Sequence, residues 1–408
     1  MKHCVLIFAL TAAVLGTAAC VNLNGSGNNP YKELKLSTKS AALARQGNTF
    51  AFEFIDRVND ATADDYIISP LSMQFLLGMI LNGAQGATAD EICKVLGYGS
   101  GEVADVNAYC LSMLQQLPDL DKKTKLSIAN ALFVNQKYSL LSNYKQTVGK
   151  FYEAEVASLD FTKNAATRKI NDWCSDHTNG LIPKILDEVS PSMLAYLLNA
   201  IYFKSQWQDK FSKGNTSPET FTDESGVRKK IQMMKTEKHF TYQENDVFRA
   251  VRLPYGNGAF AMTVILPIDG KKLSDVTDYI DGENWEEFVR TMVRCEVDLW
   301  LPKFETKFHI KLNDILSAMG MPSSFDSSKA DFKALSDQAL CLSFVQQDAV
   351  IKVDEDGTEA AVVSHAGWAA AAINPGQHVV FHADRPFLYL ITETSTGAVL
   401  FAGRYSGK

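Results

Sequence analysis

The side chains near the C-terminus that could carry chemistry are Ser364, His365 and Asp384, but they match no catalytic motif. A catalytic triad needs a fixed geometry between nucleophile, base and orienting acid, and closeness in sequence does not supply it. The chain contains no GxSxG, HExxH or GxxxxGK[ST] sequence, and its seven histidines form no spaced ligand pair. We therefore expect no enzymatic activity.

The segment 354–376 has an unusual composition for a connection between two strands, which we predict to end at Val353 and to start near Val379. Connections this long are uncommon in compact domains and are usually functional or disordered. Most of its side chains are small and uncharged. An alanine-rich helix, weakened by Gly357 and Gly367, and a plain surface loop are two alternative interpretations.

A third interpretation is a strand that is not yet part of a sheet. On the two-residue period of a strand, one face carries small or β-branched residues that could be buried. Gly357 supplies a hinge without a side chain. The face that could be buried holds Thr358, Ala360, Val362, Ser364 and Ala366, and the opposite face holds Glu359, Ala361, Val363 and His365.

The elements that position this segment are mainly helical in the first part of the chain. Residues 42–58 carry apolar side chains on a helical period. Ser69-Pro70 is a strong helix start, and the apolar run 71–81 that follows predicts a buried helix. Thr88-Ala89-Asp90-Glu91 predicts a capping box that opens another helix.

Strand-forming sequences dominate the rest of the chain. This order predicts an α+β fold, in which N-terminal helices pack on large mixed or antiparallel sheets. No later segment resembles a linker, so we expect one domain over residues 41–408. The predicted strands, rich in β-branched and aromatic residues, are 127–134, 197–203, 248–253, 260–266, 295–301, 350–353, 379–381, 387–392 and 398–401.

Six motifs, taken together and in this order, resemble those of the serpin family. The resemblance extends from about Leu43 to the end of the chain and implies the serpin fold with an exposed reactive-centre loop, at about residues 355–376. The motifs are Ser69–Ser72, Thr178–Pro183, Asn199–Trp207, Met262–Pro267, the loop hinge Lys352–Ala361 and the C-terminal signature Phe381–Ile391.

The resemblance implies a suicide-type inhibition of endopeptidases. A target protease attacks the loop and forms an acyl-enzyme, and the cut loop then inserts as a strand into the main sheet and distorts the protease. Strand insertion of this kind is a known mode of conformational switching. The implied hinge residues are Glu355, Gly357, Thr358, Glu359, Ala360, Ala361, Val362, Val363 and Ser364, and the implied shutter and breach residues are Ser69, Ser72, Asn199, Trp207 and Gln347.

The family's loop is usually cut about seventeen residues along from the hinge acid, which places the reactive bond at Ala371–Ala372. Ala370 and Ala372 remain alternatives for the residue before the cut. A small residue there suits elastase-like serine proteases, and papain-like cysteine proteases could also form the acyl intermediate. Cleavage at Trp368 would leave a short inserting arm, so we expect simple substrate behaviour there.

Four positions depart from the family pattern, the mildest being Ser364 in place of the usual threonine. Val362 and Val363 stand where inhibitory members usually carry smaller residues, and bulk at Val362 could slow insertion. Gln347 takes the place of a shutter histidine, where it could hydrogen-bond to Asn199. The alternative function is a non-inhibitory member that acts as a carrier, chaperone or decoy substrate. The absence of proline from the hinge before Pro375 favours the inhibitor.

The first twenty residues predict export. A short basic start, an apolar run at 5–15 and small residues form a secretory signal peptide over residues 1–19. The apolar run is too short to span a bilayer. Cys20 follows at the position where a bacterial lipoprotein carries its lipid, and residues 20–40 would form a flexible linker. We expect a membrane-anchored protein of the cell envelope or a released form, with ordinary cleavage before Cys20 as the alternative.

Charge and cysteine content exclude several other classes. The net charge of −7 comes without a basic stripe, so we expect no nucleic-acid or polyanion partner. Five cysteines besides Cys20 follow the signal, with no CxxC pair, which predicts neither a metal site nor a disulfide framework. Most of them suit buried apolar positions. We expect a monomer without a cofactor, whose partner is the target endopeptidase.

Overall fold

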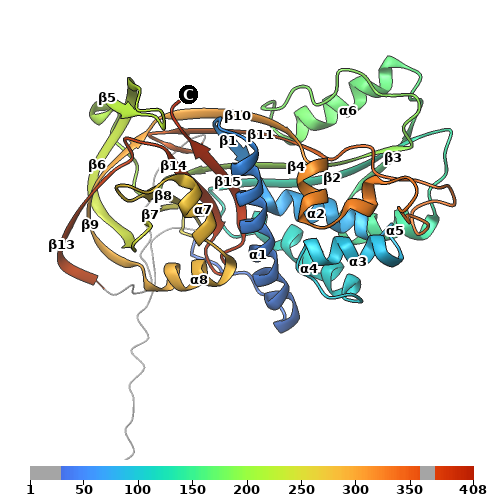
Figure 1. Ribbon diagram of the computed structural model, residues 1–408, viewed down its shortest axis with the longest axis horizontal. Helices are drawn as coiled ribbons and strands as arrows, with labels where there is room; N and C mark the ends of the chain where they lie inside the picture. The colour runs from blue at the N-terminus through green and yellow to red at the C-terminus, as the bar shows by residue number, and fades with distance from the viewer. Residues whose placement is uncertain (1–28, 359–372) are drawn as a thin grey trace, which may run out of the picture.

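The computed structural model describes residues 29–358 and 373–408, which form two large sheets surrounded by helices (Figure 1). The predicted α+β fold is confirmed. Within the described residues, no helix is both long and apolar enough to cross a membrane. The helices are α1 Thr38–Ala61, α2 Pro70–Leu81, α3 Gly86–Val95, α4 Val103–Gln116, α5 Ser142–Phe151, α6 Asn164–His177, α7 Leu273–Tyr279, α8 Gly282–Thr291 and α9 Asn313–Met319.

The sheet that concerns function has six strands in the order β10-β11-β12-β4-β2-β3. Helix α6 lies on one face of this sheet and α2 lies on the other (Figure 1). Except for β2 and β3, which run parallel, its neighbouring strands are antiparallel. The strands are β2 Lys125–Asn135, β3 Glu155–Leu159, β4 Ala195–Gln206, β10 Phe304–Lys311, β11 Gln346–Asp354 and β12 Gly357–Thr358.

The second sheet has nine strands and receives the chain on the far side of the segment 359–372. Its order is β1-β15-β14-β8-β7-β6-β9-β13, with β5 paired to β6. Strand β13 runs parallel to β9 at the edge of this sheet. The strands are β1 Tyr66–Ile68, β5 Ser217–Thr222, β6 Arg228–Glu244, β7 Phe248–Tyr255, β8 Phe260–Pro267, β9 Val293–Pro302, β13 Ile373–His382, β14 Phe387–Glu393 and β15 Val399–Tyr405.

Helix α2 forms as its sequence predicts. The Ser69 hydroxyl accepts a hydrogen bond from the backbone N–H of Ser72 at 3.2 Å, and Pro70 occupies the first turn, where its missing N–H is not needed. Every residue of α2 is buried, because the helix lies between the six-stranded sheet and the rest of the core. The sequence 71–81 is apolar nearly all round for this reason.

The predicted capping box at Thr88–Glu91 is wrong. Helix α3 begins at Gly86, so Thr88 lies inside it, fully buried. The Thr88 hydroxyl instead accepts a hydrogen bond from the backbone N–H of Asp331 at 3.0 Å. A tertiary contact has taken the hydroxyl that the sequence pattern assigns to the helix end.

The folded body begins earlier than the predicted linker 20–40 allows. Helix α1 starts at Thr38, and Leu34 is buried against the core. The Asn29 side-chain amide donates a hydrogen bond to Asp121 Oδ1 at 2.6 Å. Residues 29–40 are therefore not a free tether. The predicted signal peptide 1–19 and lipid-bearing Cys20 lie outside the described residues.

The loop boundaries are also narrower than the predicted 355–376. Gly357 and Thr358 already form β12, and β13 begins at Ile373 rather than near Val379. The cysteines fit the prediction better: Cys93, Cys110, Cys174 and Cys295 are buried and free, and Cys341 is half-buried and free.

Candidate functional site

The candidate site is a seam between β4 and β11, closed at one end by the two residues of β12. Thr358 pairs with Ser205 of β4 and with Val353 of β11, so β12 bridges the two strands. Among the described strand pairs, β4 and β11 are joined only through β12. Beyond Thr358 the seam opens into a cavity of about 420 Å³, which Thr358 itself helps to line.

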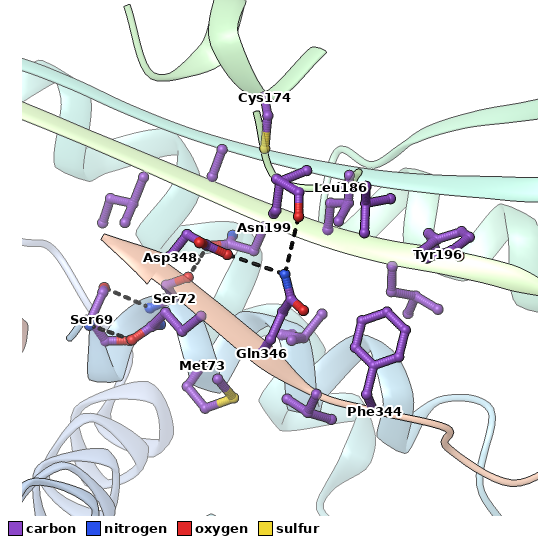
Figure 2. A pocket seen from close by; sticks show the side chains of 18 of the residues that line it. Ser69, Ser72, Met73, Cys174, Leu186, Tyr196, Asn199, Phe344, Gln346 and Asp348 are labelled. Atoms are coloured by element: carbon purple, nitrogen blue, oxygen red, sulfur yellow. Dashed lines mark hydrogen bonds between the residues drawn. The ribbon is translucent and has the colours of Figure 1, made fainter. Parts of the chain in front are cut away.

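Four predicted shutter residues, Ser69, Ser72, Asn199 and Gln347, line this cavity. Figure 2 shows Ser69 and Ser72 at the start of α2, with Ser72 beside Asn199 of β4. The Ser72 hydroxyl donates a hydrogen bond to Asn199 Oδ1. The structure therefore brings together residues that the sequence places more than a hundred positions apart.

Gln347 has a different partner from the predicted Asn199. Its side-chain amide donates to Ser69 O at 3.0 Å, and its Oε1 accepts from Ser69 N–H at 2.8 Å. Asn199 instead donates to Asn130 Oδ1 of β2 at 2.7 Å. Gln347 thus ties β11 to α2, whereas Asn199 ties β4 to both α2 and β2.

Trp207 holds the closed end of the seam. Its indole N–H donates to Asp354 O at 2.8 Å, and its backbone N–H donates to Asp356 O at 3.1 Å. The indole ring stacks on Tyr255 with 4.6 Å between ring centroids. Trp207 therefore connects the end of β4 to the end of β11 and to β7 of the other sheet.

The hinge carboxylates are held by lysines. Glu355 is buried and accepts hydrogen bonds from Lys303 Nζ and Thr216 Oγ1, both at 2.8 Å. Burial alone would raise the pKa of Glu355, but the Lys303 and Thr216 hydrogen bonds outweigh it, and the pKa is lowered. Hydrogen bonds from Lys210 and Lys213 likewise lower the pKa of Asp356.

Gly357 is required by the close approach of two strands. Its φ of +147° lies in a region that residues with a side chain rarely adopt. A Cβ atom at this position would collide with Ser205 O and lie 2.6 Å from Gln206 Cα. The prediction that this glycine lets the chain turn into the sheet therefore has a steric basis.

The remaining predicted loop residues lie outside the described part of the chain. These are the hinge residues Glu359, Ala360, Ala361, Val362, Val363 and Ser364, and the reactive-bond candidates Ala370, Ala371 and Ala372.

Sequence reasoning missed the residues that hold the hinge from other parts of the chain. Lys303 follows β9, Lys210 and Lys213 follow β4, and Tyr255 ends β7. Each meets the hinge only after folding, so no local spacing in the sequence points to it. In the described residues, no group of three or more metal-ligating side chains is found.

This geometry can accept an added strand. The seam offers two strands with a cavity between them. Its closed end is already paired through β12, and its lining is mainly apolar with a few polar groups at the shutter. Adding a strand between β4 and β11 would complete the backbone hydrogen bonds along both.

Comparison with known proteins identifies the class that the fold and this seam define. The family model described as "Serpin (serine protease inhibitor)" matches residues 45–407, so the chain belongs to the serpin family. It is 32% identical over 375 residues to Serpin B6 of Macaca fascicularis, covering 89% of this chain and 99% of that one. It is 32% identical over 370 residues to the leukocyte elastase inhibitor of Xenopus laevis, covering 88% and 97%.

Solved structures agree with this assignment. The thermophilic serpin tengpin in its native state superimposes with a TM-score of 0.79 at 29% identity, covering 93% of this chain and 97% of tengpin. Thyroxine-binding globulin in complex with thyroxine has a TM-score of 0.80 at 26% identity, covering 90% and 99%. The same fold thus includes a protein whose structure holds a small ligand.

Proposed function

We propose that this serpin inhibits endopeptidases by trapping them covalently after they cut the segment 359–372. The observation that carries the proposal is β12: the first two residues of the loop already pair with both β4 and β11, above an unfilled seam. The cut loop needs only to continue a strand that has begun.

Continuing the observed registers predicts where each loop residue goes. Thr358 pairs with Ser205 and Val353, so Val362 comes opposite Ile201 and Ala349. By the same count, Ser364 comes between Asn199 and Gln347, where its hydroxyl can join the shutter hydrogen bonds. The alternate residues 360, 362 and 364 then face the core, as the sequence pattern predicts.

The length of β4 fits a cut near Ala371 but does not distinguish it from a cut after Trp368. In the continued register, Trp368 comes opposite Ala195, the first residue of β4. A cut at Ala370, Ala371 or Ala372 therefore leaves an arm that covers the whole strand. About ten new backbone hydrogen bonds at about 1 kcal/mol each would give on the order of 10 kcal/mol, comparable to the stability of a domain.

Alanine before the cut suits proteases with a small primary pocket, so we propose elastase-like serine proteases as targets, with papain-like cysteine proteases as a second class. The similarity to a protein named leukocyte elastase inhibitor is consistent with the first class. A non-inhibitory role as a carrier, chaperone or decoy substrate is the alternative, and the structure of thyroxine-binding globulin in complex with thyroxine shows that a protein of this fold can bind a small ligand.

We also propose that the mature protein is attached to the membrane of the cell envelope through lipid on Cys20. The support is the order of basic, apolar and small residues before this cysteine. In cells that make the protein, Cys20→Ser should abolish labelling by a radioactive fatty acid and move the protein from the membrane pellet to the supernatant. Unchanged labelling in this variant would contradict the proposal.

Inhibition is tested by mixing the purified protein with an elastase-like protease and separating the products on a denaturing gel. A band at the summed mass of protease and inhibitor, resistant to boiling in detergent, is the expected result. Complete cleavage near Ala371 without such a band, and with full protease activity remaining, would favour the non-inhibitory alternative.

A further inference from the structure

The side chains of Tyr255 and Thr358 meet inside the protein, at the closed end of the seam. Their hydroxyl oxygens lie 2.7 Å apart, and either can be the donor. Tyr255 is fully buried and Thr358 is 4% exposed. Both side chains are therefore largely shielded from solvent, and removing one hydroxyl would take away the hydrogen-bond partner of the other.

Tyr255 is itself held in one orientation. Its ring stacks on Trp207 at an interplanar angle of 12°, and Phe203 packs edge-on against it with 5.3 Å between centroids. Trp207 and Tyr255 also form an isolated β-bridge. Burial raises the pKa of Tyr255 far above its ordinary value, so the phenol stays neutral and can donate or accept. The hydroxyl is thus a fixed point on the second sheet.

The contact joins the start of the loop to the other sheet of the molecule. Thr358 belongs to β12, at the start of the segment that would insert, whereas Tyr255 ends β7 of the nine-stranded sheet. The Thr358 hydroxyl points into the core, toward the buried Tyr255. Its role cannot be to contact a protease.

We propose that Tyr255 is a positioning residue that seats Thr358 in the seam before cleavage and so sets the register of insertion. The inference rests on the proposed inhibitory function. Side chains alternate along a strand, so a slip of one residue would turn Glu359 into the core and Val362 out of it. When Tyr255 holds Thr358 in the seam, that slip is excluded. The inserting strand then also begins from residues that are already paired, which favours insertion over release of the protease.

Three variants separate the hydroxyl contact from general packing. Tyr255→Phe removes one oxygen and keeps the ring stacked on Trp207, and Thr358→Val keeps the side-chain shape without the hydroxyl. Thr358→Ser restores a hydroxyl. We expect the first two to raise the number of inhibitor molecules consumed per protease by about two- to tenfold, the range that loss of one buried hydrogen bond gives. Thr358→Ser should stay near the wild-type value.

The rate at which the protease attacks the loop should change less than the number of inhibitor molecules consumed per protease, because the bond that is cut lies away from the Tyr255–Thr358 contact. The double variant Tyr255→Phe with Thr358→Val should be no worse than either single variant, since both remove the same contact. Tyr144→Phe is the matched control: its buried hydroxyl donates to Met79 O at 3.1 Å, away from the hinge.

Two results would overturn the proposal. One is that Tyr255→Phe leaves the number of inhibitor molecules consumed per protease unchanged. The other is that Tyr144→Phe raises this number equally, which would show a general loss of stability. If the wild-type protein traps no protease, the proposed function fails. Hydrogen exchange still tests whether Tyr255 holds Thr358 in the seam. The Gly357 and Thr358 amides should exchange at least about tenfold faster in Tyr255→Phe than in the wild type. Equal exchange would show that Tyr255 does not hold the hinge.

Discussion

Gln347 and Ser69 exchange two hydrogen bonds, one in each direction, between β11 and the start of α2. The amide of Gln347 donates to Ser69 O at 3.0 Å, and Ser69 N–H donates to Gln347 Oε1 at 2.8 Å. Ser69 also donates through its hydroxyl to Leu400 O at 2.6 Å. The first turn of α2 is thereby fixed to a wall of the seam that the loop would enter.

Gln347→Leu should lower the free energy of unfolding by about 1–3 kcal/mol, because it leaves the buried N–H of Ser69 without an acceptor. Urea unfolding at neutral pH measures the change. Gln346→Leu is the neighbouring control: its amide reaches Ile185 O only at 3.4 Å and Asp348 Oδ2 at 3.2 Å, in partly buried positions. An equal loss in both variants would contradict a specific role for Gln347.

The two ends of this contact show how far the sequence could predict the site. Ser69-Pro70 marks the helix start because capping is a local rule, and the structure confirms it. The partner of Gln347 depends on how β11 packs against α2, which no local pattern encodes, and the predicted contact with Asn199 was wrong. Tyr255 gave no signal at all, because its hydroxyl acquires a role only when two sheets meet.

The strands and caps that the sequence could predict are those whose pattern is set by local burial and local hydrogen bonds. Strand β6 was not predicted, since most of its residues are polar and at least partly exposed, and charged side chains interrupt the apolar alternation. Strands β8, β14 and β15 were predicted because every residue in them is buried, which produces an apolar run. The capping box at Thr88 failed because Asp331 competes for its hydroxyl.

Glu355→Gln should reduce the dependence of stability on acid pH. The folded-state pKa of Glu355 lies below its ordinary value of 4.5, so the ionised carboxylate stabilises the folded protein above that pH. This contribution is lost as the pH falls through the folded pKa. The wild type should therefore exceed Glu355→Gln in urea midpoint at pH 7, and the difference should shrink as the pH falls below 4.5 and through the folded-state pKa.

Glu305→Gln is the control for this pH series. Glu305 lies exposed on β10 and pairs with the more exposed Lys307 at 3.1 Å, so its removal should have little effect at any pH. A constant difference between wild type and Glu355→Gln from pH 7 to pH 3 would contradict the assignment of Glu355 as an ionised anchor of the hinge.

Thr358→Arg should convert the inhibitor into a substrate. Thr358 is only 4% exposed in the intact protein, so an arginine there would have to bury its charge for β12 to stay in the seam, and the inserting strand would lose its paired start. The protease should then cut the loop and be released in active form, so the covalent band on a denaturing gel disappears. Glu359→Arg carries the same charge on the face predicted to point outward and should still trap. Retained trapping by Thr358→Arg would contradict burial of this face.

Val362→Ala should improve trapping. In the continued register Val362 must enter the core opposite Ile201 and Ala349, and a smaller side chain should pass more easily. The number of inhibitor molecules consumed per protease should fall toward one. Val363→Ala, predicted to face outward, should leave this number unchanged. If Val363→Ala gave the larger improvement, the predicted faces of the inserted strand would be reversed.

The central claim is that the cut loop becomes a strand between β4 and β11, and the melting temperature of loop-cleaved protein tests it most directly. A protease that cuts near Ala371 without being trapped is used to prepare the cleaved form, and its melting is compared with that of the intact protein by calorimetry. We predict a rise of well over 10 °C, because about ten backbone hydrogen bonds and the filled cavity of about 420 Å³ stabilise the cleaved form. Equal melting temperatures would contradict insertion.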